Sequence, residues 1–235
     1  MKLGGKVAII TGGSKGIGRA IAEHYASEGA KLVVSARGEK ELIYLRDMLR
    51  EKGTEVEAIV ADMSKEDEIR NLVLQTSNRF GRIDILVNNA GFGIFKPVID
   101  METKEFDSIL NVNLRGVFIA TREVLPFMIK QKDGVIINIA SLAGKNAVEN
   151  GSIYAATKWA LLGFGKSLML EVRKHNIRVV AICPGSVDTS FGSGRSSARD
   201  WALKPEDIAE AAVLAASLPA RAMMSEIDLR PTNPR

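Results

Sequence analysis

Short apolar runs alternate along the chain with longer stretches of helical periodicity. The apolar runs have strand length and cover residues 7–11, 32–35, 56–60, 83–87, 135–140 and 178–183, with a last short one at 225–229. Uninterrupted runs of this kind are typical of strands buried on both faces of a parallel sheet. Helical patterns cover residues 19–27, 39–50, a stretch starting near 65, 103–129, and 152 to about 174.

The alternation predicts an α/β fold with one Rossmann-like, doubly wound parallel sheet and helices on both faces. A chain of 235 residues lies within the range of one hydrophobic core, so we expect a single domain over residues 1–235. In such folds ligands bind beyond the carboxyl ends of the strands. The residues at those ends therefore decide the function.

A glycine-rich turn joins the first strand to its helix. Its sequence is Gly12-Gly13-Ser14-Lys15-Gly16-Ile17-Gly18. Glycines let a ligand approach the backbone, and a helix N-terminus offers free N–H groups to an anion. The spacing is G-x-x-x-G-x-G, and in isolation an ordinary tight turn would explain it. Its position at the first strand–helix junction favours binding of a nucleotide phosphate.

The end of the second strand indicates which dinucleotide is bound. An acidic residue there holds the ribose hydroxyl of NAD, whereas an arginine accommodates the 2′-phosphate of NADP. This chain has Ala36-Arg37 there, and Lys15 supplies a second positive charge from the glycine turn. Glu39 is better explained as a first-turn residue of the next helix. We therefore predict NADP(H), although either cation alone would also be ordinary at a surface.

Polar residues mark the ends of the third and fourth strands. Asp62, followed by Met63, is placed to meet an adenine ring, with capping of the next helix as the alternative. The fourth strand ends in Asn88-Asn89-Ala90-Gly91, where small residues suit a strand end close to a ligand. Asn113 lies within a predicted helix, where asparagine is unfavourable, so we expect it to have a specific role.

Tyr154 and Lys158 lie four residues apart in a predicted helix, and Ser141 ends the fifth strand. Positions four apart share a helix face. An ammonium group beside a phenol favours the phenolate and lowers a pKa that is ordinarily about 10. The tyrosine would then serve as an acid or base near neutral pH. A surface tyrosine beside a solvated lysine is the alternative if the pair is considered alone.

Composition excludes several other classes of function. The net charge of +4 is spread along the chain without a basic block, which argues against nucleic acid binding. One cysteine, Cys183, excludes an internal disulfide framework, and two distant histidines do not suggest a metal site. The N-terminus leads directly into a strand and no apolar run has spanning length. We therefore expect a cytoplasmic enzyme without membrane contact.

In their order and spacing these motifs resemble the short-chain dehydrogenase/reductase family over nearly the whole chain. The resemblance implies that Tyr154 is the acid/base, that Lys158 lowers its pKa and binds the nicotinamide ribose, and that Ser141 orients the substrate carbonyl. It also implies that Asn113 positions a water that relays protons to Lys158. The implied cofactor contacts are Gly12, Ser14, Lys15, Gly16, Ile17, Gly18, Arg37, Asp62, Met63, Asn89, Ala90, Gly91, Tyr154, Lys158, Pro184, Gly185, Val187 and Thr189.

Within that family the chain is most similar to bacterial 3-oxoacyl-(acyl-carrier-protein) reductases. The similarity is strongest from Tyr154 to Leu168. It implies that an acidic carrier protein meets basic residues near the site, for which Lys132 and His175 are candidates beside Lys130, Arg173 and Lys174. Trp159 and a short lid at about residues 188–204 differ from that group, so other carbonyl substrates remain open.

The resulting prediction is an NADP(H)-dependent oxidoreductase that interconverts a carbonyl and a secondary alcohol. A 3-oxoacyl thioester, another small carbonyl, a diketone or a polyol are the substrates left open, and a non-catalytic NADP-binding regulator is the alternative class. The resemblance also implies a homo-oligomer, a tetramer or dimer, built on the helices of Asn113 and Tyr154. Candidates for an apolar substrate pocket are Phe92, Ile94, Phe95, Leu142, Val187, Phe191 and Trp201, with Arg195 and Arg199 as possible contacts for an anionic group.

Overall fold

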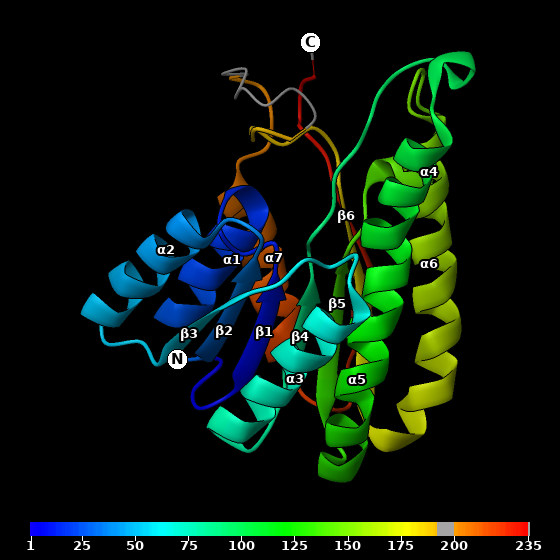
Figure 1. Ribbon diagram of the computed structural model, residues 1–235. Helices are drawn as coiled ribbons and strands as arrows, with labels where there is room; N and C mark the ends of the chain where they lie inside the picture. The colour runs from blue at the N-terminus through cyan, green and yellow to red at the C-terminus, as the bar shows by residue number, and fades with distance from the viewer. Residues whose placement is uncertain (192–199, 235) are drawn as a thin grey trace.

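The computed structural model describes residues 1–191 and 200–234. Within these residues seven strands form one sheet in the order β3-β2-β1-β4-β5-β6-β7, and every neighbouring pair is parallel. The strands are β1 (Val7–Thr11), β2 (Lys31–Ala36), β3 (Val56–Val60), β4 (Ile85–Asn88), β5 (Gly134–Ile139), β6 (Ile177–Pro184) and β7 (Glu226–Leu229). The predicted doubly wound α/β fold is confirmed (Figure 1).

Helices cover both faces of the sheet, and each face has its own apolar core. One core joins the sheet to α1 (Gly16–Ser27), α2 (Glu39–Glu51) and α7 (Pro205–Ser217). The other joins it to α3 (Glu66–Phe80), α5 (Gly116–Gln131) and α6 (Ser152–Val172). Figure 1 shows these two groups on opposite sides of the strands. No helix in the described part of the chain is both long and apolar enough to cross a membrane.

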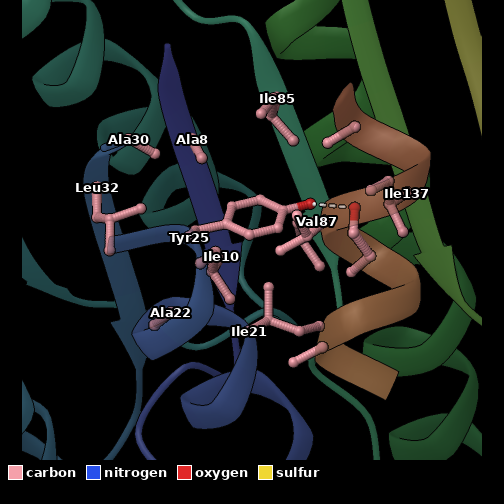
Figure 2. Close-up of a cluster of buried hydrophobic side chains, with 14 of the residues drawn as sticks. Ala8, Ile10, Ile21, Ala22, Tyr25, Ala30, Leu32, Ile85, Val87 and Ile137 are labelled. Atoms are coloured by element: carbon pink, nitrogen blue, oxygen red, sulfur yellow. Dashed lines mark hydrogen bonds between the residues drawn. The ribbon is translucent and has the colours of Figure 1, made fainter. Parts of the chain in front are cut away.

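Tyr25 shows how the first core accommodates a polar group. Its ring is fully buried between β1 and the helices of that face, as Figure 2 shows. The phenol donates a hydrogen bond to the backbone carbonyl of Ala212 in α7, at 3.0 Å between the two oxygens. A buried hydroxyl without a partner would be costly, so this bond lets α1 and α7 pack together through a tyrosine.

The helix predicted over residues 103–129 is present but not uniform. It consists of α4 (Thr103–Leu110), a π-helical segment (Asn111–Arg115) and α5. The π-helical segment contains Asn113, the residue whose place in a helix seemed unfavourable. π-helical turns are rare and frequently lie at functional sites. The helix after β5 also ends slightly earlier than expected, at Val172, and a 3-10 turn follows it (Arg173–His175).

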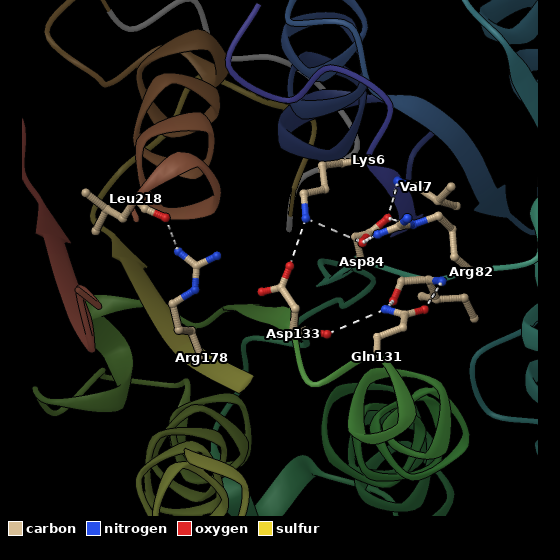
Figure 3. A network of polar contacts seen from close by, with 9 residues as sticks. Lys6, Val7, Arg82, Asp84, Gln131, Asp133, Arg178 and Leu218 are labelled. Carbon is tan, nitrogen blue, oxygen red and sulfur yellow. Dashed lines mark hydrogen bonds and ion pairs between the residues drawn. The ribbon is translucent and has the colours of Figure 1, made fainter. Parts of the chain in front are cut away.

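A network of charged side chains ties the strands together at their amino ends (Figure 3). The buried carboxylate of Asp84 accepts hydrogen bonds from the backbone N–H of Val7 and from the Nε and Nη2 atoms of Arg82. Lys6 bridges Asp84 and Asp133, at 3.6 and 2.8 Å between nitrogen and oxygen. Because this edge is closed by ion pairs, the opposite edge, formed by the carboxyl ends, is where a ligand site is expected.

Candidate active site

The carboxyl ends of β1 and β4 are held together by two side chains. The hydroxyl oxygen of Thr11 accepts hydrogen bonds from the backbone N–H groups of Asn89 and Ala90, both at 3.1 Å. The Asn89 amide donates in return to the carbonyls of Thr11 and Gly12. The strand order reverses between β1 and β4, because β2 and β3 lie on one side of β1 and β5 to β7 lie beyond β4. Doubly wound folds bind their ligands at such a reversal point. Thr11 was not predicted, and its place just before the glycine turn was the available signal.

The glycine turn has no room for side chains at two of its positions. A Cβ at Gly12, whose φ is +64°, would lie 2.9 Å from the Ala90 Cα, and a Cβ at Gly18 would lie 2.3 Å from the Gly12 carbonyl oxygen. Helix α1 begins at Gly16 without a side-chain cap, and its first turn contains no acidic residue. Uncapped N–H groups beside a bare backbone form a cradle that fits a phosphate. Lys15, exposed at the N-cap, adds positive charge.

Arg37 and Asp62 lie at the ends of the adjacent strands β2 and β3. Arg37 is exposed directly after β2. The Asp62 carboxylate accepts hydrogen bonds from the backbone N–H and the hydroxyl of Ser64, at 2.9 and 2.8 Å. Burial opposes ionisation of Asp62, but the Ser64 hydrogen bonds and the nearby charge of Arg37 outweigh it and keep its pKa low. The local turn before α3 thus occupies Asp62, and its contact with adenine stays a prediction.

Lys158 is anchored inside the protein rather than on its surface. Its side chain is only 6% exposed, and the Nζ atom donates a 2.8 Å hydrogen bond to the carbonyl of Ile139, the last residue of β5. Burial lowers the pKa of this lysine to about 8, so the ammonium form still prevails at pH 7. The same atom lies 5.7 Å from the centre of the Tyr154 ring. The predicted pair therefore shares one helix face.

The effect of this arrangement on Tyr154 differs from the sequence-based expectation. Tyr154 is 8% exposed, and burial raises its pKa above the ordinary value for a phenol, while a hydrogen bond with Ser141 acts in the opposite direction. The expectation that the pKa of Tyr154 lies below the ordinary value is not met by the protein's own groups, because burial of the phenol dominates. At neutral pH Tyr154 therefore carries its proton and is ready to donate it.

Ser141 reaches Tyr154 because the short turn after β5 packs on α6. Ser141 is the N-cap of a 3-10 turn (Leu142–Gly144), and its hydroxyl oxygen accepts the N–H of Ala143 at 3.1 Å. A Cβ at Gly144 would lie 2.8 Å from the Lys158 carbonyl oxygen, so only glycine permits this close approach. The N–H of Ala143 uses one lone pair of the Ser141 hydroxyl, and the hydroxyl proton can be donated to a neighbouring oxygen.

Asn113 connects the loop after β4 with the helix that carries Tyr154. Its side-chain amide, 1% exposed, exchanges two hydrogen bonds with the backbone of Phe92 and donates a third to the Thr157 hydroxyl, at 3.2 Å. That hydroxyl donates in turn to the Tyr154 carbonyl at 2.7 Å. Thr157 was not predicted, and its place between Tyr154 and Lys158 was the signal. The relay of protons through Asn113 stays a prediction.

Two exposed aromatic side chains flank Tyr154. The ring centres of Phe95 and Phe191 lie 5.4 and 5.5 Å from that of Tyr154. Phe95 comes from the loop after β4, and Phe191 belongs to the predicted lid. A β-bridge between Val187, directly before the lid region, and Leu203, near its end, brings the two ends of that region together. Arg195 and Arg199 lie outside the described residues.

Three more of the predicted cofactor residues lie at the same edge of the sheet. Thr189 lies beside the glycine turn, since a Cβ added at Gly16 would lie 3.4 Å from its methyl group. Pro184 ends β6, and the N–H of Gly185 bonds to the Leu229 carbonyl of β7. The structure thus brings the turn, the strand ends and the start of α6 to one edge of the sheet.

The basic residues predicted to meet a carrier protein do not join this site. Lys132 is the C-cap of α5, and His175 lies at the far end of α6, directly before β6. Tyr154 lies in the first turn of the same 21-residue helix. A helix of that length spans about 30 Å, so the basic residues lie near the amino ends of the strands. The expectation that they lie near the site is wrong within one chain.

Fold and site together define a nucleotide-binding α/β oxidoreductase with a Ser-Tyr-Lys arrangement. The short chain dehydrogenase family matches residues 6–200, and the chain belongs to this family. An uncharacterized oxidoreductase of Staphylococcus saprophyticus is 36% identical over 98% of this chain and 99% of its own.

Three solved structures share the architecture. A metagenomic short-chain oxidoreductase in complex with NADP is 38% identical, with a TM-score of 0.89 over all of both chains. An alcohol dehydrogenase from the archaeon Thermococcus sibiricus, complexed with 5-hydroxy-NADP, is 33% identical with a TM-score of 0.93 over 98% of both chains. Levodione reductase is 31% identical with a TM-score of 0.89, over 97% of this chain and 96% of its own.

Proposed function

We propose that the protein reduces a ketone to a secondary alcohol with NADPH, and that Tyr154 is the proton donor. The observation that carries this proposal is the buried phenol of Tyr154, whose ring centre lies 5.7 Å from the Lys158 Nζ atom, at the edge of the sheet that also holds Ser141 and the glycine turn. A protonated phenol suits reduction, because the carbonyl oxygen needs a proton as it becomes an alcohol.

The cofactor proposal rests on the shape and charge of the backbone and side chains at the carboxyl ends of the strands. The bare backbone at Gly12 and Gly18 and the uncapped start of α1 fit a pyrophosphate. Lys15 and Arg37 offer positive charge for a 2′-phosphate, and two similar proteins were solved with NADP or a hydroxylated NADP. We propose that Ser14, Gly16, Ile17, Asp62, Met63, Asn89, Ala90, Gly91, Pro184, Gly185, Val187 and Thr189 complete the site. When bound, the reduced cofactor supplies a hydride to the substrate carbon.

The chain's own residues then have distinct tasks. Tyr154 gives its phenolic proton to the substrate oxygen, and the Ser141 hydroxyl hydrogen-bonds the same oxygen as negative charge develops there. Lys158, protonated and fixed on Ile139, places a positive charge beside the phenol, which stabilises the phenolate left after transfer. Asn113 holds the loop after β4 against α6.

Among the predicted substrates, apolar ketones and diketones have the best support. Phe95 and Phe191 present aromatic surface beside Tyr154, and a polyol would leave hydroxyl groups unpaired there. One of the similar structures is named levodione reductase, so a chain of this architecture reduces the compound that this name gives. For a 3-oxoacyl carrier-protein thioester the support is the sequence resemblance alone. A non-catalytic regulator is disfavoured because Ser141, Tyr154 and Lys158 are all present and in contact.

A substrate panel tests the proposal. NADPH oxidation would be followed with cyclic and linear diketones, aryl ketones, acetoacetyl thioesters and sugars at equal concentration. We expect turnover of the apolar ketones or diketones and values of kcat/KM at least about tenfold lower for sugars. NADPH binding by titration, without turnover of any carbonyl, would instead support the regulator. Preference for the thioester would identify the reductase of carrier-linked substrates.

We also propose that two copies pair through α5 and α6 in a homo-oligomer. α5 leaves the side chain of Phe118 45% exposed, and α6 leaves Trp159 and Leu170 55% and 62% exposed. Large apolar residues that are grouped and exposed often mark a protein–protein interaction site. Sedimentation velocity of the wild-type protein and of Trp159→Glu tests this. We expect a dimer or tetramer that dissociates in the variant, and a wild-type monomer would refute the pairing.

A further inference from the structure

The π-helical segment between α4 and α5 is held by other elements on two sides. On the inner side Asn113 contacts Phe92 and Thr157. On the outer side the Arg115 guanidinium donates to the Glu66 carboxylate at 2.8 Å and to the Ser64 carbonyl at 3.5 Å. The segment therefore links the turn before α3 with the helix that carries the catalytic tyrosine.

The start of α5 is also pressed against that turn. A Cβ at Gly116 would lie 2.2 Å from the Met63 carbonyl oxygen, so a side chain at this position would force the two segments apart. Gly116 directly follows Arg115, the last residue of the π-helical segment. An ion pair and a close backbone approach thus fix the same end of the segment.

A π-helical turn needs this kind of support. Its hydrogen bonding is less favourable than that of an α-helix, and it persists where surrounding contacts favour it. Successive helical residues are rotated by about 100°, so a return to α-helical bonding would turn Asn113 and Arg115 relative to each other. A contact that fixes Arg115 consequently fixes the direction in which Asn113 points.

We propose that the Arg115–Glu66 ion pair is a positioning contact for Asn113, and through Thr157 for Tyr154 and Lys158. This inference rests on the proposed function, because the position of Asn113 affects turnover only if the site around Tyr154 is catalytic. The pair is partly exposed, at 48% and 27%, and exposed pairs contribute little to stability. Its loss therefore acts on the site without unfolding the protein.

Arg115→Gln tests the proposal, with Arg70→Gln as the matched control. Both arginines bind Glu66 at 2.8 Å, but Arg70 lies on the same helix as Glu66 and does not touch the π-helical segment. In either variant Arg122 continues to pair with Glu66. The two substitutions remove the same charge and one partner of the same carboxylate. Arg70→Gln also removes the contacts of Arg70 with Asp67 and Glu123, and only Arg115→Gln removes a contact of the π-helical segment.

Two measurements are made on both variants. The first is amide hydrogen exchange of Phe92, whose N–H is bonded to the Asn113 side chain. We expect exchange about tenfold faster in Arg115→Gln and unchanged in Arg70→Gln. The second is steady-state kinetics, where we expect kcat about fivefold lower in Arg115→Gln, with unchanged KM for NADPH and unchanged unfolding midpoint, and partial recovery in Arg115→Lys.

The outcomes separate this inference from the proposed function. Wild-type protein without carbonyl turnover would refute the proposed function, while Phe92 exchange would still decide whether Arg115 positions Asn113. Phe92 exchange in Arg115→Gln equal to wild type would overturn the positioning role. An equal change in Arg70→Gln would also overturn it, since the effect would then come from the charge of the Glu66 cluster.

Discussion

Replacing Tyr154 with phenylalanine is expected to lower kcat for ketone reduction by about 10³-fold, within the usual range for the loss of a general acid. The substitution removes one oxygen and keeps the ring, so the packing against Phe95 and Phe191 is retained. The dissociation constant for NADPH should change by less than about twofold, because the glycine turn and strand ends supply most of the proposed binding surface. Stopped-flow turnover and fluorescence titration measure the two quantities.

Tyr44→Phe is the matched control for this substitution. Tyr44 lies exposed on α2, far along the chain from Ser141 and Lys158, and should leave kcat unchanged. Ser141→Ala should reduce kcat less than Tyr154→Phe, since it removes a hydrogen bond to the oxygen but keeps the proton donor. Substantial turnover by Tyr154→Phe would show that another group donates the proton.

Much of this site follows from the sequence because its parts depend on local pattern. Uninterrupted apolar runs identified the strands, and the chemistry-bearing residues followed them directly. Since parallel strands end at one edge, Ser141 after β5 and the turn after β1 had to meet there. The four-residue spacing of Tyr154 and Lys158 placed both on one helix face without any knowledge of the tertiary structure.

Other features depend on distant partners and could not be read in this way. The π-helical segment persists through bonds from Asn113 to Phe92 and to Thr157, which is 44 residues away. Helix propensity flagged Asn113 as unusual but could not give its partners. The pKa of Tyr154 depends on how deeply the phenol is buried, and burial outweighs what spacing from a lysine suggests.

The basic residues Lys132 and His175 show a related limit. Sequence similarity placed them near the site. Similarity alone does not tell whether a residue at the end of a helix lies at the carboxyl edge of the sheet or at its amino edge. In this fold each helix runs from the carboxyl edge of the sheet back to the amino edge. Residues that follow α5 and α6 therefore lie at the edge opposite the site.

Arg37→Asp is expected to shift the ratio of kcat/KM for NADPH over that for NADH by about 10²-fold toward NADH. The guanidinium at the end of β2 is proposed to meet the 2′-phosphate, and a charge-assisted hydrogen bond of this kind is worth about 1.5–3 kcal/mol. A carboxylate there repels the phosphate and accepts a hydrogen bond from the ribose hydroxyls of NADH. Initial rates with each cofactor at saturating ketone measure the ratio.

Lys52→Asp is the control, because it makes the same charge change at an exposed position beyond the other end of α2. It should leave the cofactor ratio unchanged at physiological ionic strength, where charges separated by more than about 8 Å are largely screened. Asp62, near Arg37, would add a second negative charge in Arg37→Asp and strengthen the effect on NADPH. An unchanged ratio of kcat/KM for NADPH over NADH in Arg37→Asp would mean that Arg37 does not bind the 2′-phosphate. Lys15 would then be the residue to replace next.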